Sequence, residues 1–332
     1  MLNHLVTELR QALGLLYKQD IQVAAQALGQ EVQCSVLQRQ AIAQSEAAIR
    51  LGDDCAAIPD GDSFLLLAAE GMWPLLVETE PWFAGWCSVL VNVSDIYAMG
   101  GHPVAVVDAL WSASPEISQE LWNGMVAASK AFDVPIVGGH TNGHSPYHAL
   151  SVAILGRATH LITSFDARPG DVLVLATDFR GKAHSTHPFW DAATEADPKQ
   201  LQRNLAILPD LAKSGLCRAG KDISMGGIIG TTLMLLESSG CGAVLTVDQI
   251  PVPSGISLQK WLLSFPSYGF LLSIHPGHVE TVQNRFIAND LICEVIGHIQ
   301  PGSELTLTNG IETEVFWNLT NKPLTGFSPS IA

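Results

Sequence analysis

Two adjacent carboxylates follow a glycine at residues 52–54, and another acid, Glu70, ends the apolar run 64–69. Gly52 permits a tight turn, and the oxygens of Asp53 and Asp54 are ligands of the kind that Mg²⁺ prefers. Because the chain contains no G-x-x-x-x-G-K-[ST] loop, a polyphosphate would be held here through a divalent metal. The alternative interpretation is a solvated turn, since glycine and aspartate are common turn residues.

Asp95 interrupts an apolar helical pattern over residues 81–99. It lies four residues from Val91 and from Met99, which places it on the apolar stripe of that helix. An unpaired carboxylate is costly to bury. We therefore expect Asp95 to be either a buried hydrogen-bonded group or a metal ligand, and the sequence leaves both open.

A glycine pair, Gly138 and Gly139, precedes His140 and Thr141 at the end of a predicted short strand. Glycines at such a place let the backbone approach a ligand closely. His140 also begins a set of three histidines spaced by four residues, which could suggest zinc. However, Gly143 and Pro146 interrupt any helix there, so the histidines have no common helical face, which disfavours a zinc site.

The stretch 221–227 leads directly into an apolar helix and contains Asp222, Ser224 and Gly226. Asp222 and Ser224 could cap that helix. The same free N–H groups at the helix start could instead receive a phosphate. Both interpretations remain open from the sequence.

The composition of the whole chain limits the classes of partner that we expect. The 332 residues are 47% hydrophobic, which is enough for about two domains. A net charge of −15 disfavours nucleic acid and anionic membranes as partners, and it favours import of positive charge as a metal ion. The six cysteines include no C-x-x-C pair, and neither an export signal nor an apolar stretch of 18 residues is present. We therefore expect a cytoplasmic protein with reduced, buried thiols.

Alternating strand and helix patterns position these residues. We expect an N-terminal helical extension at 1–50, a domain at 51–165, a second domain at 166–318 and a loop-like tail at 319–332. The predicted helices are 4–48, 81–99, 115–132, 198–214, 226–238 and 276–288. The predicted strands are 63–70, 104–110, 135–137, 149–156, 172–176, 242–247, 269–274 and 292–298. We expect the strand 63–70 to be buried.

Six segments between residues 50 and 300 resemble, in order and spacing, the aminoimidazole ribonucleotide (AIR) synthetase superfamily. That superfamily includes thiamine-monophosphate kinase, selenophosphate synthetase and a hydrogenase maturation factor. The segments are Gly52-Asp-Asp-Cys-Ala, the strand ending at Glu70, Asn92-Val-Ser-Asp-Ile-Tyr-Ala-Met-Gly100, Gly138-Gly-His-Thr141, Pro169-Gly-Asp-Val-Leu-Val174 and Asp222-Ile-Ser-Met-Gly-Gly227.

The resemblance implies an α/β (α+β) chain of PurM-like, two-domain architecture. It implies a homodimer whose N-terminal mixed sheets join in a barrel-like interface, a C-terminal α/β sandwich domain, and a cleft that binds ATP and Mg²⁺. It assigns catalysis to Asp54, Asp95 and Asp222, and metal binding to these three together with Glu70. It assigns nucleotide contacts to Gly52, Asp53, Gly138, Gly139, His140, Thr141, Arg157, Ser224 and Gly226.

Two positions depart from the pattern of thiamine-monophosphate kinase, which carries acids where this chain has His140 and Met225. Metal binding is therefore expected to differ from that of the kinase. The Cys/Sec-Gly-Cys-Lys loop of selenophosphate synthetase has no counterpart before Leu51. The overall pattern is most similar to AIR synthase-related proteins of unassigned substrate.

The segment 178–194 concentrates charged and aromatic side chains in a chain that is otherwise poor in cations. Such a mixture suits an anionic or aromatic small molecule, although a mobile surface loop is the alternative. The residues predicted to bind the acceptor are Arg180, Lys182, His187, Trp190 and Asp191.

The sequence therefore favours an ATP- and Mg²⁺-dependent kinase or synthetase that activates a substrate oxygen by phosphoryl transfer. A nucleotide-binding regulatory or scaffold protein that has lost turnover is the alternative, because of His140 and Met225. A weaker alternative is a metal-dependent hydrolase that uses the same acids on water.

Overall fold

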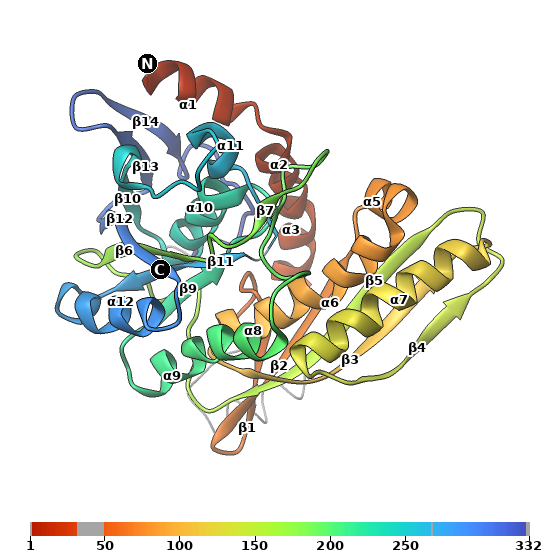
Figure 1. Ribbon diagram of the computed structural model, residues 1–332. Helices are drawn as coiled ribbons and strands as arrows, with labels where there is room; N and C mark the ends of the chain where they lie inside the picture. Colours follow the sequence, from red (N-terminus) through yellow and green to blue (C-terminus); the bar gives the residue numbers. More distant parts are fainter. Residues whose placement is uncertain (1, 32–49, 267, 330–332) are drawn as a thin grey trace.

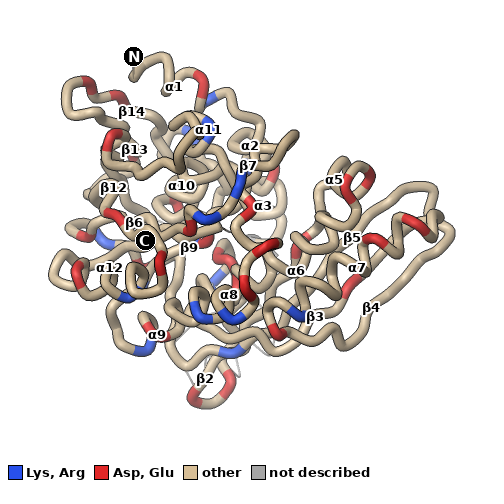
Figure 2. Tube along the Cα trace, viewed as in Figure 1, with Lys and Arg blue, Asp and Glu red and all other residues tan. Residues whose placement is uncertain are grey.

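The computed structural model describes residues 2–31, 50–266 and 268–329. It contains two large sheets with helices packed on them, one from each half of the chain, and the two halves lie side by side (Figure 1). Asp and Glu residues are distributed over both halves (Figure 2). None of the helices in the described ranges is long and apolar enough to cross a membrane.

The first sheet has five strands in the order β1-β2-β5-β3-β4, and only β3 and β4 pair in parallel. Its strands are β1 (Ala56–Asp60), β2 (Ser63–Gly71), β3 (His102–Trp111), β4 (Ile136–Asn142) and β5 (Ala149–Ala158). The predicted strand 63–70 is present as β2, but the expectation that it is buried is wrong. Leu66 is fully buried while Leu67 is exposed, because one face of this sheet carries helices and the other faces solvent.

Helices α5 (Pro74–Thr79), α6 (Pro81–Ala98) and α7 (Pro115–Phe132) lie in the first half of the chain. Proline opens α6 and α7, where its missing N–H is not needed for the helix. Two glycines set how closely these helices pack. A Cβ on Gly85 would lie 2.0 Å from the carbonyl oxygen of Leu121, and a Cβ on Gly124 would lie 1.9 Å from that of Trp82. The close approach fixes the position of α6, the helix that carries Asp95.

The second sheet has seven strands in the order β14-β13-β10-β12-β6-β11-β9. Its strands are β6 (Val172–Thr177), β9 (Ala219–Asp222), β10 (Gly242–Thr246), β11 (Gly269–Ile274), β12 (Ile292–Gln300), β13 (Glu304–Thr308) and β14 (Thr313–Asn318). Both faces are covered, as alternation along β6 shows. Leu173 and Leu175 join one apolar core, while Val174 and Ala176 join another on the opposite face.

The helices of the second half lie on both faces of this sheet. They are α8 (Pro198–Leu205), α9 (Ile207–Lys213), α10 (Gly227–Ser239), α11 (Leu258–Leu262) and α12 (Val279–Ile287). The predicted helix 198–214 is therefore two helices that meet at Ala206. A small two-stranded sheet, β7 (Lys182–Ala183) with β8 (Trp190–Asp191), lies within the segment 178–194.

The N-terminal segment packs on the second half of the chain (Figure 1). It consists of α1 (Leu2–Arg10), α2 (Leu13–Leu16), the short 3₁₀ helix η1 (Tyr17–Asp20) and α3 (Ile21–Glu31). A single helix over 4–48 was therefore the wrong expectation in the described part, and 32–48 lies outside the described residues. Leu9 and Leu15 are fully buried in the core around α10, and Arg10 Nε donates to the Phe316 carbonyl at 2.9 Å.

Candidate active site

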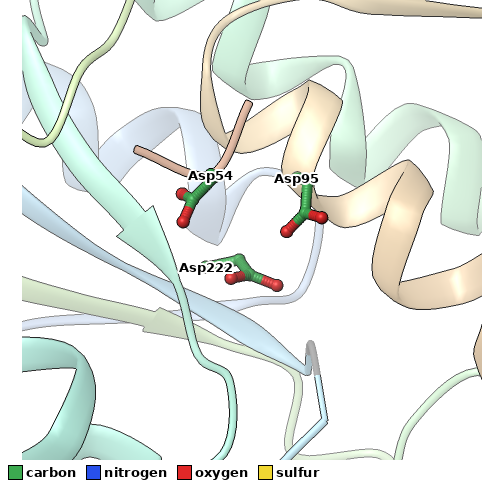
Figure 3. Close-up of side chains that lie close together, drawn as sticks. All are labelled: Asp54, Asp95 and Asp222. Carbon is green, nitrogen blue, oxygen red and sulfur yellow. The ribbon is translucent and has the colours of Figure 1, made fainter. Parts of the chain in front are cut away.

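Three carboxylates from distant parts of the sequence meet where the two halves of the chain join (Figure 3). Asp54 lies on the loop before β1, Asp95 on α6 and Asp222 at the end of β9. One oxygen of each lies within 4.8 Å of the others. Because α6 contacts both β9 and the first sheet, its close packing holds the third acid against the other two.

The oxygens of this cluster suit a divalent cation. Asp95 is only 7% exposed, and the buried atoms Asp95 Oδ2 and Asp54 Oδ2 lack a hydrogen-bond partner among the described residues. A buried carboxylate oxygen without a partner is unfavourable, and a cation would satisfy it. Oxygens held this close can share an ion with bonds of about 2.1–2.5 Å. The Asp54, Asp95 and Asp222 carboxylates thus fit Mg²⁺ or Ca²⁺.

The electrostatics of Asp95 agree with that fit. Burial raises the pKa of the Asp95 carboxyl well above its ordinary value, and the negative charges of Asp222, Glu70 and Asp54 raise it further. Positive charge supplied to the cluster would favour the ionised form of this carboxyl.

Lys221 supplies part of that positive charge. Its Nζ donates to Asp54 Oδ1 at 2.5 Å and to Ser164 Oγ at 2.9 Å. Burial opposes the charge, but Asp54 and Asp53 together raise the pKa of Lys221 above its ordinary value. One oxygen of Asp54 is therefore occupied by an ammonium, which leaves Oδ2 for a metal ion.

Asp53 has a different environment from its neighbour. Its two oxygens accept from the backbone N–H and the hydroxyl of Ser164, at 2.9 and 2.5 Å. Burial raises the pKa of Asp53 to about 6, in spite of the nearby charge of Lys221. Asp53 joins the first half of the chain to the loop at Ser164, whereas Asp54 faces the cluster.

The cluster lies in a cleft with a cavity volume of about 390 Å³. Glu70, at the end of β2, is exposed on this cleft and is not one of the three clustered acids. The apolar part of the wall comes from α5, α6 and the segments around Phe189 and Phe265. The two ends of the chain also contribute to the lining, through Tyr17, Lys18, Ile21, Thr325 and Phe327.

The glycine and serine predicted to lie next to the acids are found there. Gly52 has a φ of +102°, and a Cβ at this position would lie 2.5 Å from the side chain of Phe327. Ser224 and Met225 line the cleft. Gly226 is the N-cap residue of α10 with a φ of +96°, and no side chain caps this helix. The capping interpretation of Asp222 and Ser224 is therefore wrong.

Other predicted nucleotide contacts lie elsewhere in the chain. Gly138, Gly139, His140 and Thr141 do not end a short strand but continue it, because β4 pairs with β3 as far as Asn142. β4 is the edge strand, separated from β2 by β5 and β3. Three strand spacings amount to about 14 Å, so within one chain these residues do not reach the cleft.

Arg157 also lies outside the cleft. It is on β5, and its guanidinium donates to Asp60 Oδ2 on β1 at 2.8 Å, in an exposed ion pair. The structure thus brings Asp54, Asp95 and Asp222 together with Gly52, Asp53, Glu70 and Ser224, but it does not bring Arg157 to them.

The predicted acceptor residues are mostly engaged by their neighbours. Arg180 pairs with Asp178 at 2.6 Å, and Lys182 pairs with Glu195 on the surface. Asp191 accepts from the backbone of its own turn, at Ala193 and Thr194.

Trp190 is buried, and its Nε1 donates to the carbonyl of Asp178 at 2.8 Å. His187 lies closer to the cleft, because its ring packs edge-on against Trp73 at 5.2 Å and Trp73 lines the wall. The structure therefore brings one of the five predicted acceptor residues near the cleft.

Sequence reasoning missed three contributors to the site. Lys221 directly precedes Asp222, but neighbours in a strand point to opposite faces, so the sequence did not suggest that both serve the cluster. Ser164 and Lys18 carry no local signal, because their partners Asp53 and Ser224 are far away in sequence.

Comparison with known proteins finds relatives for both halves of the chain. The models for the N-terminal and C-terminal domains of AIR synthase related protein match residues 52–158 and 168–309. The chain is 60% identical to the uncharacterized protein sll0787 of Synechocystis sp., over 99% of both chains. It is 30% identical to thiamine-monophosphate kinase of Pyrococcus horikoshii, over 61% of this chain and 68% of the kinase.

A similar fold occurs in a solved structure of T. maritima PurL complexed with ATP. The TM-score is 0.70 at 17% identity, and the match covers 94% of this chain and 56% of that one. The acid cluster lies on segments from both matched domains. The chain therefore belongs to the AIR synthase related family, within the PurM-like superfamily.

Proposed function

We propose that this protein is an ATP- and Mg²⁺-dependent enzyme that transfers the γ-phosphoryl group to an oxygen of a small molecule. The product is either left phosphorylated or carried into a condensation. The observation that carries this proposal is the convergence of Asp54, Asp95 and Asp222 within 4.8 Å in a cleft, with buried oxygens that need a cation. The ATP-bound PurL and the thiamine-monophosphate kinase named above support the nucleotide.

The chain's own residues would hold the charges of such a reaction. Asp54, Asp95 and Asp222 would bind the metal, which offsets negative charge as the phosphoryl group moves. Lys221 fixes the direction of the Asp54 carboxylate through its hydrogen bond to Oδ1. Ser224 and the turn at the start of α10 present a hydroxyl and N–H groups to phosphate oxygens.

The apolar end of the cleft is suited to an acceptor with an organic body. Trp73 and Leu76 from the first half face Phe189 and Phe265 from the second half. Apolar walls with a few charged groups at one end bind small molecules and exclude water from the reacting atoms. The acceptor oxygen would lie between this wall and the acid cluster.

We also propose a cytoplasmic homodimer. The solvent face of the first sheet carries Leu67, Val107 and Leu155, all more than a third exposed. Leu67 and Leu155 are paired across β2 and β5, so they form a continuous apolar surface. A face of this kind is expected to be covered by another molecule, and a second copy offers the same surface.

Calorimetric titration with a non-hydrolysable ATP analogue tests the proposal. We expect binding in the presence of Mg²⁺ and little binding in EDTA. The double variant Asp54→Asn, Asp95→Asn should lose the Mg²⁺-dependent part, while Asp210→Asn on α9, outside the cleft, should not. Absence of binding by the wild type, or equal binding by the double variant, would contradict the proposal.

A second candidate is a nucleotide-binding regulatory or scaffold protein of the same fold. It is favoured by Met225, which lines the cleft where the kinase pattern has an acid. Tight ATP binding with a slow hydrolysis rate that no candidate acceptor increases would support this candidate over the enzyme.

A further inference from the structure

The N-terminal segment places one lysine in the cleft, and this segment precedes the family-matched residues 52–309. Lys18 lies on η1, and its Nζ donates to Ser224 Oγ at 3.2 Å. Ser224 lies two residues after Asp222 of the acid cluster. The lysine therefore reaches the turn at the start of α10 from a segment more than 200 positions away in the sequence.

The position of Lys18 is fixed by packing on both sides of it. Leu15 is fully buried in the core around α10. A Cβ on Gly14 would lie 3.2 Å from the backbone nitrogen of Gly226, so α2 approaches the turn closely. Gln22 Nε2 donates to the carbonyls of Pro323 and Leu324 at 2.9 and 3.1 Å. These contacts hold the N-terminal segment in place as one wall of the cleft.

The ammonium of Lys18 retains hydrogen-bonding capacity. An ammonium has three donors, and among the described residues Lys18 makes one hydrogen bond and no ion pair. Lys221, the other cation among the described residues that line the cleft, is already bonded to Asp54 and Ser164. Burial lowers the pKa of Lys18, and the negative charge of Glu70 opposes that effect. Among the residues that the structure describes, the cleft thus holds one lysine whose ammonium is bonded to Asp54 and Ser164 and one whose ammonium has further donors available.

We propose that Lys18, with the hydroxyl of Ser224, forms a subsite for the terminal phosphate of the nucleotide. This inference rests on the proposed function, because it adds a phosphate-binding residue to the same cleft. The three acids would hold metal on one side of the triphosphate, and Lys18 would donate directly to a phosphate oxygen on another. A charge-assisted hydrogen bond of this kind is stronger than a neutral one.

Two ligands distinguish this role from a general balancing of charge. If Lys18 contacts the terminal phosphate, Lys18→Met should weaken binding of the Mg²⁺ complex of a non-hydrolysable ATP analogue by at least about tenfold. It should change binding of Mg²⁺–ADP by less than about twofold, since ADP lacks that phosphate. Lys18→Arg should recover part of the affinity, and Lys213→Met, which removes an exposed lysine on α9, should change neither.

The outcomes separate this inference from the proposed function. If the wild type binds neither nucleotide, the proposed function fails. If the wild type binds both, and Lys18→Met either binds the analogue normally or loses both nucleotides equally, the subsite is wrong.

A measurement on the wild type covers the case in which Lys18→Met is unstable. Lys18 can be acetylated with an amine-reactive acetylating reagent, and the rate can be followed by mass spectrometry. The analogue with Mg²⁺ should lower this rate much more than ADP with Mg²⁺ does. Equal protection by the two nucleotides would overturn the subsite.

Discussion

Two apolar helices of this protein each bury one carboxylate, and their environments are opposite. Glu237, on α10, is 2% exposed and accepts from the backbone N–H groups of Leu324, Thr325 and Gly326 and from the Thr325 hydroxyl. Asp95, on α6, is 7% exposed and has an oxygen without a partner in the described part of the chain.

The difference teaches how to separate a structural acid from a candidate ligand. Both residues interrupt apolar helices, so burial alone does not distinguish them. Glu237 is satisfied by the protein and fixes the C-terminal segment, including the region of Phe327 that borders the cleft. Asp95 has an oxygen that no described residue satisfies, which makes it a candidate ligand. The same contrast applies to the segment 178–194, where charges are abundant but have protein partners: Arg180 pairs with Asp178, and Lys182 pairs with Glu195 just beyond the segment.

The largest effect is expected on stability, at Glu237, whose carboxylate is hydrogen-bonded by the protein. Glu237→Gln places an amide N–H₂ among backbone donors and leaves some of them unpaired. We expect the free energy of unfolding to fall on the order of 4 kcal/mol. Urea denaturation at constant pH measures this change. A loss below about 1 kcal/mol would mean that the tail is held by other contacts and would break the comparison.

The acid of the cluster should behave in the opposite way. Asp95→Asn should weaken Mg²⁺-dependent binding of the ATP analogue by roughly 100-fold or more. Without metal, its free energy of unfolding should not fall, because Asn keeps the shape of the side chain and carries no charge for burial and the neighbouring acids to disfavour. Calorimetry and urea denaturation on the same preparation give both quantities. A stability loss as large as that of Glu237→Gln would show that Asp95 is a structural acid.

Asp53 is a further buried carboxylate with protein partners, and the pH dependence of the free energy of unfolding tests its environment. Its pKa is about 6 in the folded protein and 3.8 in the reference state, so the folded state binds more protons between these values. The contribution of Asp53 to stability is therefore greatest at low pH and is lost as pH rises.

From about pH 4 to about pH 6 this loss amounts to about 2 kcal/mol. The difference in free energy of unfolding between wild type and Asp53→Asn, measured without metal, should show it. A difference independent of pH over this range would contradict the raised pKa.

The smallest effect is expected in the segment 178–194. Lys182 forms a surface ion pair with Glu195, and surface pairs contribute little. Lys182→Met should leave affinity for the ATP analogue and for any identified acceptor within about twofold, since a pair this exposed is largely screened. A clear loss of acceptor affinity, measured by calorimetry beside wild type, would instead restore the prediction that this segment binds the substrate.

The sequence by itself determined the elements and the set of candidate acids. Proline at the start and the glycine pair after the end predicted α6 closely, and α7 likewise begins at a proline, because these residues act through local backbone geometry. The alternation of strands and helices predicted two α/β units, and the ordered motifs predicted the superfamily. The resemblance to that superfamily also implies Asp54, Asp95 and Asp222 as metal ligands.

The tertiary structure alone decided which of the predicted residues share a site. Sequence spacing carries no information on whether β4 lies beside the cleft or at the far edge of its sheet, so Gly138 and Thr141 were placed with the acids. Nor does it show that Arg180 is paired with Asp178 or that Lys18 reaches Ser224. Pairing and satisfaction of charges depend on contacts between distant segments, and these contacts arise only when the two sheets and the chain ends pack together.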